Sequence, residues 1–427
     1  MALKIINKLD TYLKKIHQLN KSESQVKVKK TLTEIKDTII SKKDKGVLEY
    51  CQKFDNVELK GFSLKVSKRE INNAYKKVSP EFITAIKKAK ANITDYHKKQ
   101  KPKNWEASPE DGKRYGIQYS ALETVGLYVP GGRAPYFSTV LMNCIPALVA
   151  GVTRPIICTP PQQDGKIAPQ ILVAADICGV TEIYKVGGAQ AIFAMAYGTE
   201  KIPKVDKIVG PGNIYVDLAK QMVYGDVDID KPAGPSDVLV VVEDERYASF
   251  AASEMLAQLE HDPSSIAITI ASNEECLQAV RLEFTNQLKT LSKKEIILES
   301  MKNSGIILIE ESDNIIKAIN KVAAEHLVLL INNYKPILKQ VKHAGSIFCG
   351  PYTPVTMGDY FSGPNHVLPT SGTARFASPL GVMDFVKYSS YMHCSKSNLM
   401  KASKHLKVLT ELEGFDAHYN AVDLRLK

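Results

Sequence analysis

The fold is decided by four consecutive segments, RPIICTPP (154–161), APQILVAADICGV (168–180), TEIYKVGG (181–188) and AQAIFAMAYGTE (189–200). The first and third are short apolar runs typical of buried strands, and the second and fourth are longer apolar stretches that favour helices. Strands that alternate with helices through short loops are typical of βαβ units around a parallel sheet. The stretch therefore predicts an α/β domain with helices on both faces of its sheet.

The same alternation resumes further along the chain. Strands are expected at SSIAITIAS (264–272), SGIILIEE (304–311) and HLVLLIN (326–332), with helices at ASFAASEMLAQLEHDP (248–263) and DNIIKAINKVAAEHL (313–327). Unbroken apolar strands of this kind indicate parallel sheets that are covered on both faces. The sequence thus predicts a second α/β unit of the same class.

The expected organisation has four parts. Residues 106–235 form the first, dinucleotide-binding α/β domain, and residues 236–377 form the second, which carries the reacting groups. Residues 1–105 have apolar positions at helical spacing and are expected to pack on the second unit as a helical region. Residues 378–427 are expected to be a helical tail. The fold class is α/β, with two doubly wound, incomplete Rossmann-like units between helical extensions.

Composition narrows the class of protein. The chain has 427 residues, 44% of them hydrophobic, and a formal charge of +10 from 56 basic and 46 acidic side chains, which excludes a disordered or fibrous chain. Only eight of the basic residues are Arg, whereas specific nucleic-acid readers depend on the bidentate Arg fork. The Lys excess is therefore interpreted as a solvated surface, and no nucleic-acid partner is expected.

The cysteines and the N-terminal residues indicate the cellular compartment. The cysteines are scattered and form no CxxC pair, which is typical of a protein from a reducing compartment. The first 20 residues lack a continuous apolar core and a cleavage site, and no stretch is long and apolar enough to span a membrane. A cytoplasmic protein with no membrane partner is expected.

Three glycine-bearing loops follow expected strands and precede expected helices. They begin at Tyr128, Gly187 and Gly210, and none contains the usual dinucleotide fingerprint G-x-G-x-x-G. In open α/β sheets ligands bind at the carboxyl ends of the strands, where glycine lets the backbone approach them. Ordinary β–α turns also need glycine, so a binding role and a structural role both stay open.

Polar residues recur in otherwise apolar surroundings. Gln258 and His261 are three residues apart, a spacing that places two metal ligands on one face of a helix, but Gln is a weak ligand and a capped, solvent-facing helix end also explains the pair. Glu325 and His326 adjoin, which suits acid–base chemistry, although His is also common at helix C-termini. The long irregular stretch around Asp359 and His366 indicates a functional loop.

Taken together, these stretches resemble the histidinol dehydrogenase family. The match is carried by GLYVPGGRAPYFSTVLMN (126–143), IVGPGN (208–213), AGPSD (233–237), AQLEHD (257–262), AAEHL (323–327), GDYFSGPNHVLPT (358–370) and EGFDAHYNAV (413–422). The resemblance implies a homodimeric enzyme that uses one Zn²⁺ per subunit and two NAD to oxidise L-histidinol, through its aldehyde, to L-histidine in histidine biosynthesis.

The resemblance also implies roles for particular residues. His326 handles the alcohol proton and Glu325 activates water. The zinc ligands are Gln258, His261, Asp359 and His418, the last supplied by the partner subunit. The implied substrate contacts are Ser236, Gln258, His261, His326, Asp359, Glu413 and His418, and the implied NAD contacts are Tyr128, Gln190 and Asn213.

The chain departs from the family pattern at four positions that carry none of these roles. Asp237 stands where the family has Glu, and Glu254, Leu259 and Tyr388 also differ from the usual residues. Two other functions compete with this one. One is a zinc hydrolase that uses Glu325 and His326, which leaves the three glycine-bearing loops unexplained. The other is a nucleic-acid-binding α/β protein, which needs clustered Arg and exposed aromatic residues that the sequence does not show.

Overall fold

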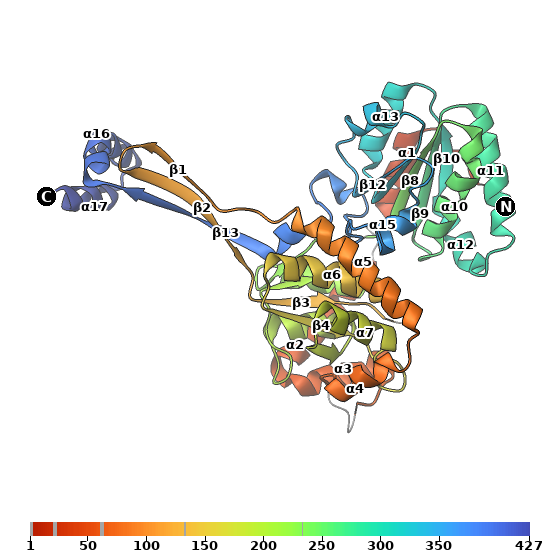
Figure 1. Cartoon of the computed structure of the whole chain (residues 1–427), viewed down its shortest axis with the longest axis horizontal. Coiled ribbons are helices and arrows are strands. Elements are labelled where there is room, and N and C mark those ends of the chain that lie inside the picture. The colour runs from red at the N-terminus through yellow and green to blue at the C-terminus, as the bar shows by residue number, and fades with distance from the viewer. Residues whose placement is uncertain (1–2, 20–23, 60–63, 132–133, 233) are drawn as a thin grey trace.

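The computed structural model describes residues 3–19, 24–59, 64–131, 134–232 and 234–427, and two five-stranded parallel sheets dominate these residues (Figure 1). The first sheet has the order β5-β4-β3-β6-β7 and the second the order β10-β9-β8-β11-β12. Numbered within each unit, both orders are 3-2-1-4-5. This is the doubly wound order without its sixth strand, so the expected fold class is confirmed.

The first unit covers both faces of its sheet with helices. Its strands are β3 (Thr124–Tyr128), β4 (Arg154–Thr159), β5 (Ile183–Lys185), β6 (Lys207–Val209) and β7 (Asp228–Ile229), and its helices are α6 (Phe137–Ala150), α7 (Pro169–Cys178), α8 (Gly188–Tyr197) and α9 (Ile214–Val223). Side chains of α6 and α7 form one hydrophobic core and those of α8 and α9 another. Helices α6, α7 and α8 are apolar nearly all round, because further helices cover them on the side away from the sheet.

The second unit repeats the plan. Its strands are β8 (Asp237–Val242), β9 (Ile266–Ala271), β10 (Gly305–Leu308), β11 (His326–Leu330) and β12 (Ser346–Cys349), and its helices are α10 (Ala248–Leu259), α11 (Glu274–Leu288), α12 (Lys294–Ser300), α13 (Ser312–Val322), α14 (Lys335–Leu338) and α15 (Val355–Tyr360). Cores again lie on both faces, one with α10 and α11 and one with α13.

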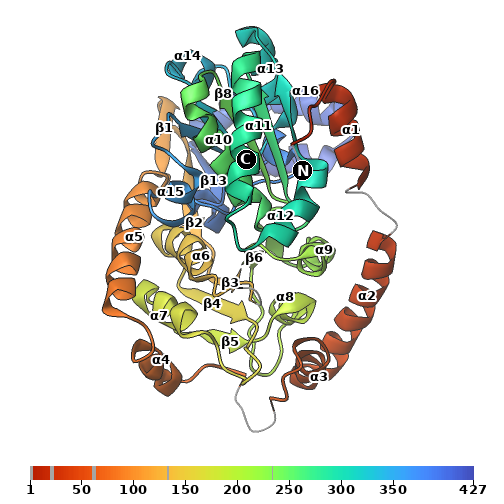
Figure 2. The same ribbon diagram turned by 90° about the vertical axis from the view of Figure 1, so that its right-hand side faces the viewer.

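The expectation that residues 1–105 pack on the second unit is wrong for most of that region (Figure 2). Only residues 3–8 and α1 (Leu9–Leu19) do so, with Ile5 bridging Ile306 of β10. The remaining helices are α2 (Ser24–Lys42), α3 (Asp44–Asp55), α4 (Lys68–Tyr75) and α5 (Pro80–Lys98). Their apolar faces belong to the cores of the first unit. Amphipathic spacing predicts a helix but does not say which sheet its apolar stripe will cover.

A three-stranded antiparallel sheet forms an arm that was not predicted from the sequence (Figure 1). It consists of β1 (Trp105–Glu110), β2 (Lys113–Ala121) and β13 (Val386–Cys394), and it carries α16 (Lys396–Glu413) and α17 (Asp416–Leu426) at its tip. The expected helical tail over 378–427 is therefore wrong for its first part. Residues 386–394 do not alternate between apolar and polar, because most of β13 is exposed, so the usual strand signal is missing.

The two units meet through the loop that follows α15. Asn365 donates from Nδ2 to the carbonyl of Met142 in α6 (2.7 Å), and the Tyr360 ring lies 6.5 Å from that of Phe137 at the start of α6. Because α6 begins at the carboxyl edge of the first sheet, that edge faces the α15 loop.

Among the described residues, no helix has the length and apolar character needed to cross a bilayer.

Candidate active site

Glu325 and His326 lie at the amino end of β11, not at the end of a helix. Helix α13 ends at Val322, Ala323 turns the chain with a φ of +52°, and His326 is the first residue of the strand, in register with Val238 of β8. The side chains of both Glu325 and His326 are buried. The structural alternative, a His that ends a helix, is therefore wrong, and the pair is available for acid–base chemistry.

The backbone around Glu325 is joined to the neighbouring strand by two reciprocal bonds. The Glu325 amide donates to Oδ1 of Asp237 (2.7 Å), and the Asp237 amide donates to Oε2 of Glu325 (3.1 Å). The Ser236 hydroxyl also donates to the Glu325 carboxylate. Burial raises the pKa of Glu325, and burial together with the nearby Glu325 charge raises the pKa of Asp237 to about 7. Two buried carboxyl groups thus lie side by side at the amino edge of the sheet.

His326 lies between carboxylates. Its Nδ1 is 3.8 Å from Oε2 of Glu325 and 3.3 Å from the carbonyl oxygen of Asp237, and its Nε2 is 3.8 Å from Oδ1 of Asp359. Burial lowers the pKa of His326, but Glu325 and Asp359 outweigh that effect and raise the pKa to about 9. The buried Nε2 has no hydrogen-bond partner within the described part of the chain, which leaves it available for a ligand.

Helix α10 brings the candidate metal ligands to the same edge. Gln258 lies buried in its last turn, and His261 follows just beyond the end of the helix, at the surface. Desolvation lowers the pKa of His261, while Asp359 opposes this change. A lowered pKa favours the neutral imidazole, which is the form that binds zinc. Asp359 is near enough to His261 and His326 that both lower its own pKa, so the three side chains share one electrostatic neighbourhood.

Glu254 and His366 contact the segment that carries Asp359 and help to fix its position. Glu254 of α10 accepts a hydrogen bond from the amide of Val355, the first residue of α15, and so ties the helix that carries Asp359 to α10. His366 has its Nδ1 2.9 Å from the carbonyl oxygen of Asp359 and its Nε2 3.4 Å from Oγ1 of Thr139 in the first unit. Glu254 stood out in the sequence only as a departure from the family pattern, and spacing gave no signal for Thr139.

The structure does not bring Glu413 and His418 to this edge. Both are exposed on the α16–α17 tip of the arm, which lies at the opposite end of the molecule from α10 and α15 (Figure 1). Within the described residues no group of three His, Cys, Asp or Glu side chains is placed to hold a metal ion. One chain by itself places His261 near Asp359, with Gln258 in the last turn of the neighbouring α10, and leaves His418 remote.

The three candidate NAD contacts lie at the carboxyl edge of the first sheet. Tyr128 ends β3 and its hydroxyl accepts a hydrogen bond from the amide of Gly188 (3.0 Å). Gln190 lies in the first turn of α8, is 1% exposed, and its Nε2 has no partner among the described residues. Asn213 caps α9 by accepting from the amide of Tyr215 (3.0 Å). The three loops thus meet at one edge, as expected for neighbouring parallel strands.

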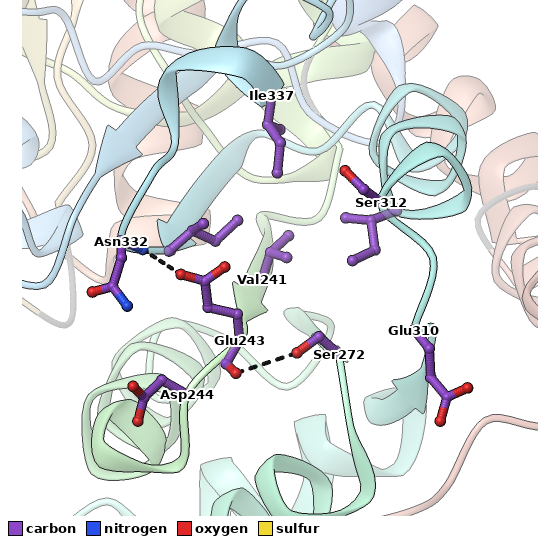
Figure 3. Close-up of a pocket in the computed structure, with 10 residues that line it drawn as sticks. Val241, Glu243, Asp244, Ser272, Glu310, Ser312, Asn332 and Ile337 are labelled. Atoms are coloured by element: carbon purple, nitrogen blue, oxygen red, sulfur yellow. Dashed lines mark hydrogen bonds between the residues drawn. The ribbon is translucent and has the colours of Figure 1, made fainter.

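A hollow of about 410 Å³ lies at the opposite, carboxyl edge of the second sheet (Figure 3). None of the candidate site residues lines it. Its rim carries the carboxylates of Glu243, Asp244 and Glu310, and Glu243 is bonded to the amide of Asn332 just past β11. The two sheets therefore differ: the candidate NAD contacts at the carboxyl edge of the first are neutral polar groups, whereas the hollow at the carboxyl edge of the second is rimmed by carboxylates.

Comparison with known proteins shows which family this chain is similar to. The family model for histidinol dehydrogenase matches residues 18–426. A histidinol dehydrogenase from Clostridium acetobutylicum is 49% identical over 93% of this chain and 92% of its own length, and one from Bacillus cereus is 48% identical over 94% and 93%. A crystal structure of histidinol dehydrogenase from Elizabethkingia anophelis superposes with a TM-score of 0.93 at 37% identity, covering 100% of this chain and 98% of that one.

The two α/β units and the buried acid–base pair, taken with these matches, define an NAD-dependent α/β dehydrogenase that acts on an alcohol or aldehyde. The chain belongs to the histidinol dehydrogenase family. This membership supports the dehydrogenase interpretation over the zinc hydrolase and the nucleic-acid-binding protein.

Proposed function

We propose that this protein oxidises L-histidinol to L-histidine in two successive hydride transfers to NAD, at a zinc site shared by two subunits. The observation that carries the proposal is the buried Glu325–His326 pair, which the fold places beside Asp359 and His261. Family membership at 49% identity over nearly the whole chain supports the substrate.

The two residues can divide the chemistry of a four-electron oxidation. In the first step the substrate hydroxyl loses its proton to His326 while a hydride leaves the same carbon for NAD, which forms the aldehyde. In the second step water adds to the aldehyde with Glu325 as the base, and a second hydride leaves for a second NAD, which forms the acid. A raised pKa suits Glu325 for this role, because a base works best when its pKa approaches the ambient pH.

The donor set fits a zinc ion. Gln258, His261 and Asp359 offer an amide oxygen, an imidazole nitrogen and a carboxylate oxygen from one chain, and His418 of a second subunit would complete the set. Bound zinc supplies Lewis-acid polarisation of the substrate and an anchor for its nitrogen atoms. Glu325 and Asp359 together raise the pKa of His326, and a cation at Asp359 would offset the Asp359 part of that effect. The pKa of His326 would then be lower and the ring better able to accept a proton.

We assign NAD to the first unit because of the position of its three glycine-bearing loops and because of the charges at the carboxyl edges of the two sheets. Its pyrophosphate is an anion, and the carboxylates of Glu243, Asp244 and Glu310 at the carboxyl edge of the second sheet would repel it. The first sheet offers the buried, unpaired Nε2 of Gln190 and the amino-terminal ends of α8 and α9, which favour anions. Because this edge faces the α15 loop, a nicotinamide held there lies toward His326.

The arm supports a homodimer. It extends from the body and exposes large apolar side chains, among them Met400, Leu409, Leu412 and Phe415. Exposed apolar residues gathered on one element are typical of an interface. The arm also carries Glu413 and His418, so a second subunit would complete each site. The seven cysteines are free thiols, which suits the cytoplasm.

The proposal is tested by coupling zinc analysis to absorbance at 340 nm. We expect about one zinc per subunit and two molecules of NADH for each molecule of histidinol consumed. A protein that forms no NADH from histidinol with NAD, or that hydrolyses a substrate without forming NADH, would overturn it.

A further inference from the structure

The amino end of the β8–β11 strand pair is held by side chains as well as by the sheet. Asp237, the first residue of β8, accepts the Glu325 amide through its carboxylate and donates its own amide to the Glu325 carboxylate. On the other side of the same strand, the carbonyl oxygen of Glu325 accepts a hydrogen bond from the amide of Ser346 (2.8 Å). The backbone of Glu325 is therefore held on both sides before the strand begins.

The same contacts determine where the reacting side chains point. The Asp237 amide holds one oxygen of the Glu325 carboxylate, and the Asp237 carbonyl oxygen lies 3.3 Å from Nδ1 of His326. Asp237 thus reaches the backbone of Glu325, the side chain of Glu325 and the ring of His326 from one position. It is 8% exposed and therefore has little freedom to leave that position.

We propose that Asp237 is a positioning residue that holds the Glu325–His326 pair in its working geometry through the bond from its carboxylate to the Glu325 amide. This inference rests on the proposed function of the pair. Asp237 itself does not touch the substrate in this proposal and acts only through its neighbours. Small misplacements of reacting groups are costly, since about 1 Å can reduce the rate by about a hundredfold.

The chain provides a matched control at the other end of the same strands. The carboxylate of Glu243, just past β8, accepts the amide of Asn332, just past β11, so it makes the same kind of bond between the same two strands (Figure 3). Asp237→Ala and Glu243→Ala each remove one such bond. Only the first is adjacent to the reacting pair.

The experiment compares Asp237→Ala, Asp237→Asn and Glu243→Ala in the zinc-loaded dimer. Asp237→Ala should lower kcat by about 10- to 100-fold and leave the KM for histidinol and for NAD within about threefold. Asp237→Asn keeps an oxygen that can accept the Glu325 amide, so it should restore kcat to within about threefold of the wild type. Glu243→Ala should leave kcat unchanged. If the alanine variant at Asp237 is too unstable, Asp237→Leu removes the acceptor while keeping the branched shape of the side chain.

A second measurement does not depend on turnover. Hydrogen exchange of the peptide that spans 323–327 should be faster in Asp237→Ala than in Asp237→Asn or Glu243→Ala. Two outcomes would overturn the positioning role while the proposed function stands, given a wild type that forms two NADH. In one, Asp237→Ala keeps its kcat; in the other, the kcat of Asp237→Asn falls as far as that of Asp237→Ala. A wild type that forms no NADH overturns the proposed function, and exchange at 323–327 then still decides whether Asp237 holds this segment.

Discussion

Single residues at the site take their properties from neighbours that are distant in sequence. Asp237 and Glu325 are 88 residues apart, and Asp359 is further still along the chain. The sequence marked Glu325 and His326 as adjacent and left a structural alternative open. Burial beside two other carboxyl groups is what removes that alternative, and burial is a property of the folded chain. The roles of Gln258 and His418 came from the family resemblance, because spacing alone did not distinguish them from surface residues.

Glu325→Gln tests the division of labour within the pair. The amide keeps the size of the side chain but cannot accept a proton from water, so the second oxidation should fail while the first continues. We expect the ratio of NADH to histidinol to fall from about two toward one, with aldehyde accumulating, as followed at 340 nm and with an aldehyde-trapping reagent. Glu243→Gln serves as the control. A variant with unchanged rate and unchanged ratio would contradict the role assigned to Glu325.

Glu182 offers a prediction on stability that is independent of catalysis. Arg154, Tyr184 and Lys65 bind its carboxylate and, with Arg154 contributing most, lower its pKa from 4.5 to about 2. A lowered pKa stabilises the fold above the unfolded value of 4.5, and this stabilisation disappears as the pH falls through about 2. Glu182→Gln should therefore reduce the free energy of unfolding at pH 7 by about 1–2 kcal/mol, after allowance for solvent screening.

The measurement is thermal unfolding of both proteins at several pH values. The difference in stability between wild type and Glu182→Gln should have its full size at pH 7 and should shrink between pH 4.5 and about 2. Glu411→Gln is the control, because its partner Lys407 is 3.8 Å away on an exposed helix face, and such pairs contribute little. A difference that stays constant from pH 7 to pH 3 would mean that the ionised carboxylate is not the source of the stabilisation.

At the scale of elements, the apolar runs predicted most strands and helices of both units, because strands buried on both faces need apolar residues at every position. The arm was missed. Its hairpin does have a local signal, the Asp111-Gly112 pair between β1 and β2, where Gly112 has a φ of +72°. The third strand of the arm comes from residues 386–394, and only the folded chain shows that these pair with β2.

The loop between β6 and α9 carries a prediction about NAD. Gly210 has a φ of +118°, and a Cβ there would lie 2.1 Å from the carbonyl oxygen of Tyr128. The buried pair of Lys220 and Asp230 holds the same loop, with Lys220 donating to the Gly210 carbonyl and Asp230 accepting its amide. Gly210→Ala must therefore displace the loop or Tyr128.

We expect Gly210→Ala to raise the KM for NAD about tenfold or more and to leave the binding of histidinol nearly unchanged. The control is Gly225→Ala, where φ is +104° but nothing lies within 4 Å of the added Cβ. It introduces the same backbone strain without the collision. Steady-state kinetics with each substrate varied in turn provides the comparison, and equal KM values for NAD in the two variants would contradict a role of this loop in cofactor binding.

The whole molecule determines whether a site is complete. One chain holds Gln258, His261, Glu325, His326 and Asp359 at the amino edge of the second sheet and carries His418 on a remote arm. If sites are shared, a subunit with His326→Asn and a subunit with His418→Asn should be inactive alone. Mixed after dissociation, they should recover about a quarter of the wild-type activity, because half of the dimers are mixed and each has one intact site. No recovery in verified mixed dimers would contradict a shared site.

By itself the sequence determined the two α/β units, the lack of the usual glycine fingerprint, and the residues that identify the family. It could do so because periodicity and motif residues are local in the chain. Only the tertiary structure decided that helices α2 to α5 cover the first unit, that a three-stranded arm carries the tail away from the body, and that Asp237 joins β8 to Glu325. These features depend on which surfaces meet and on bonds across long sequence separations, and a local pattern contains neither.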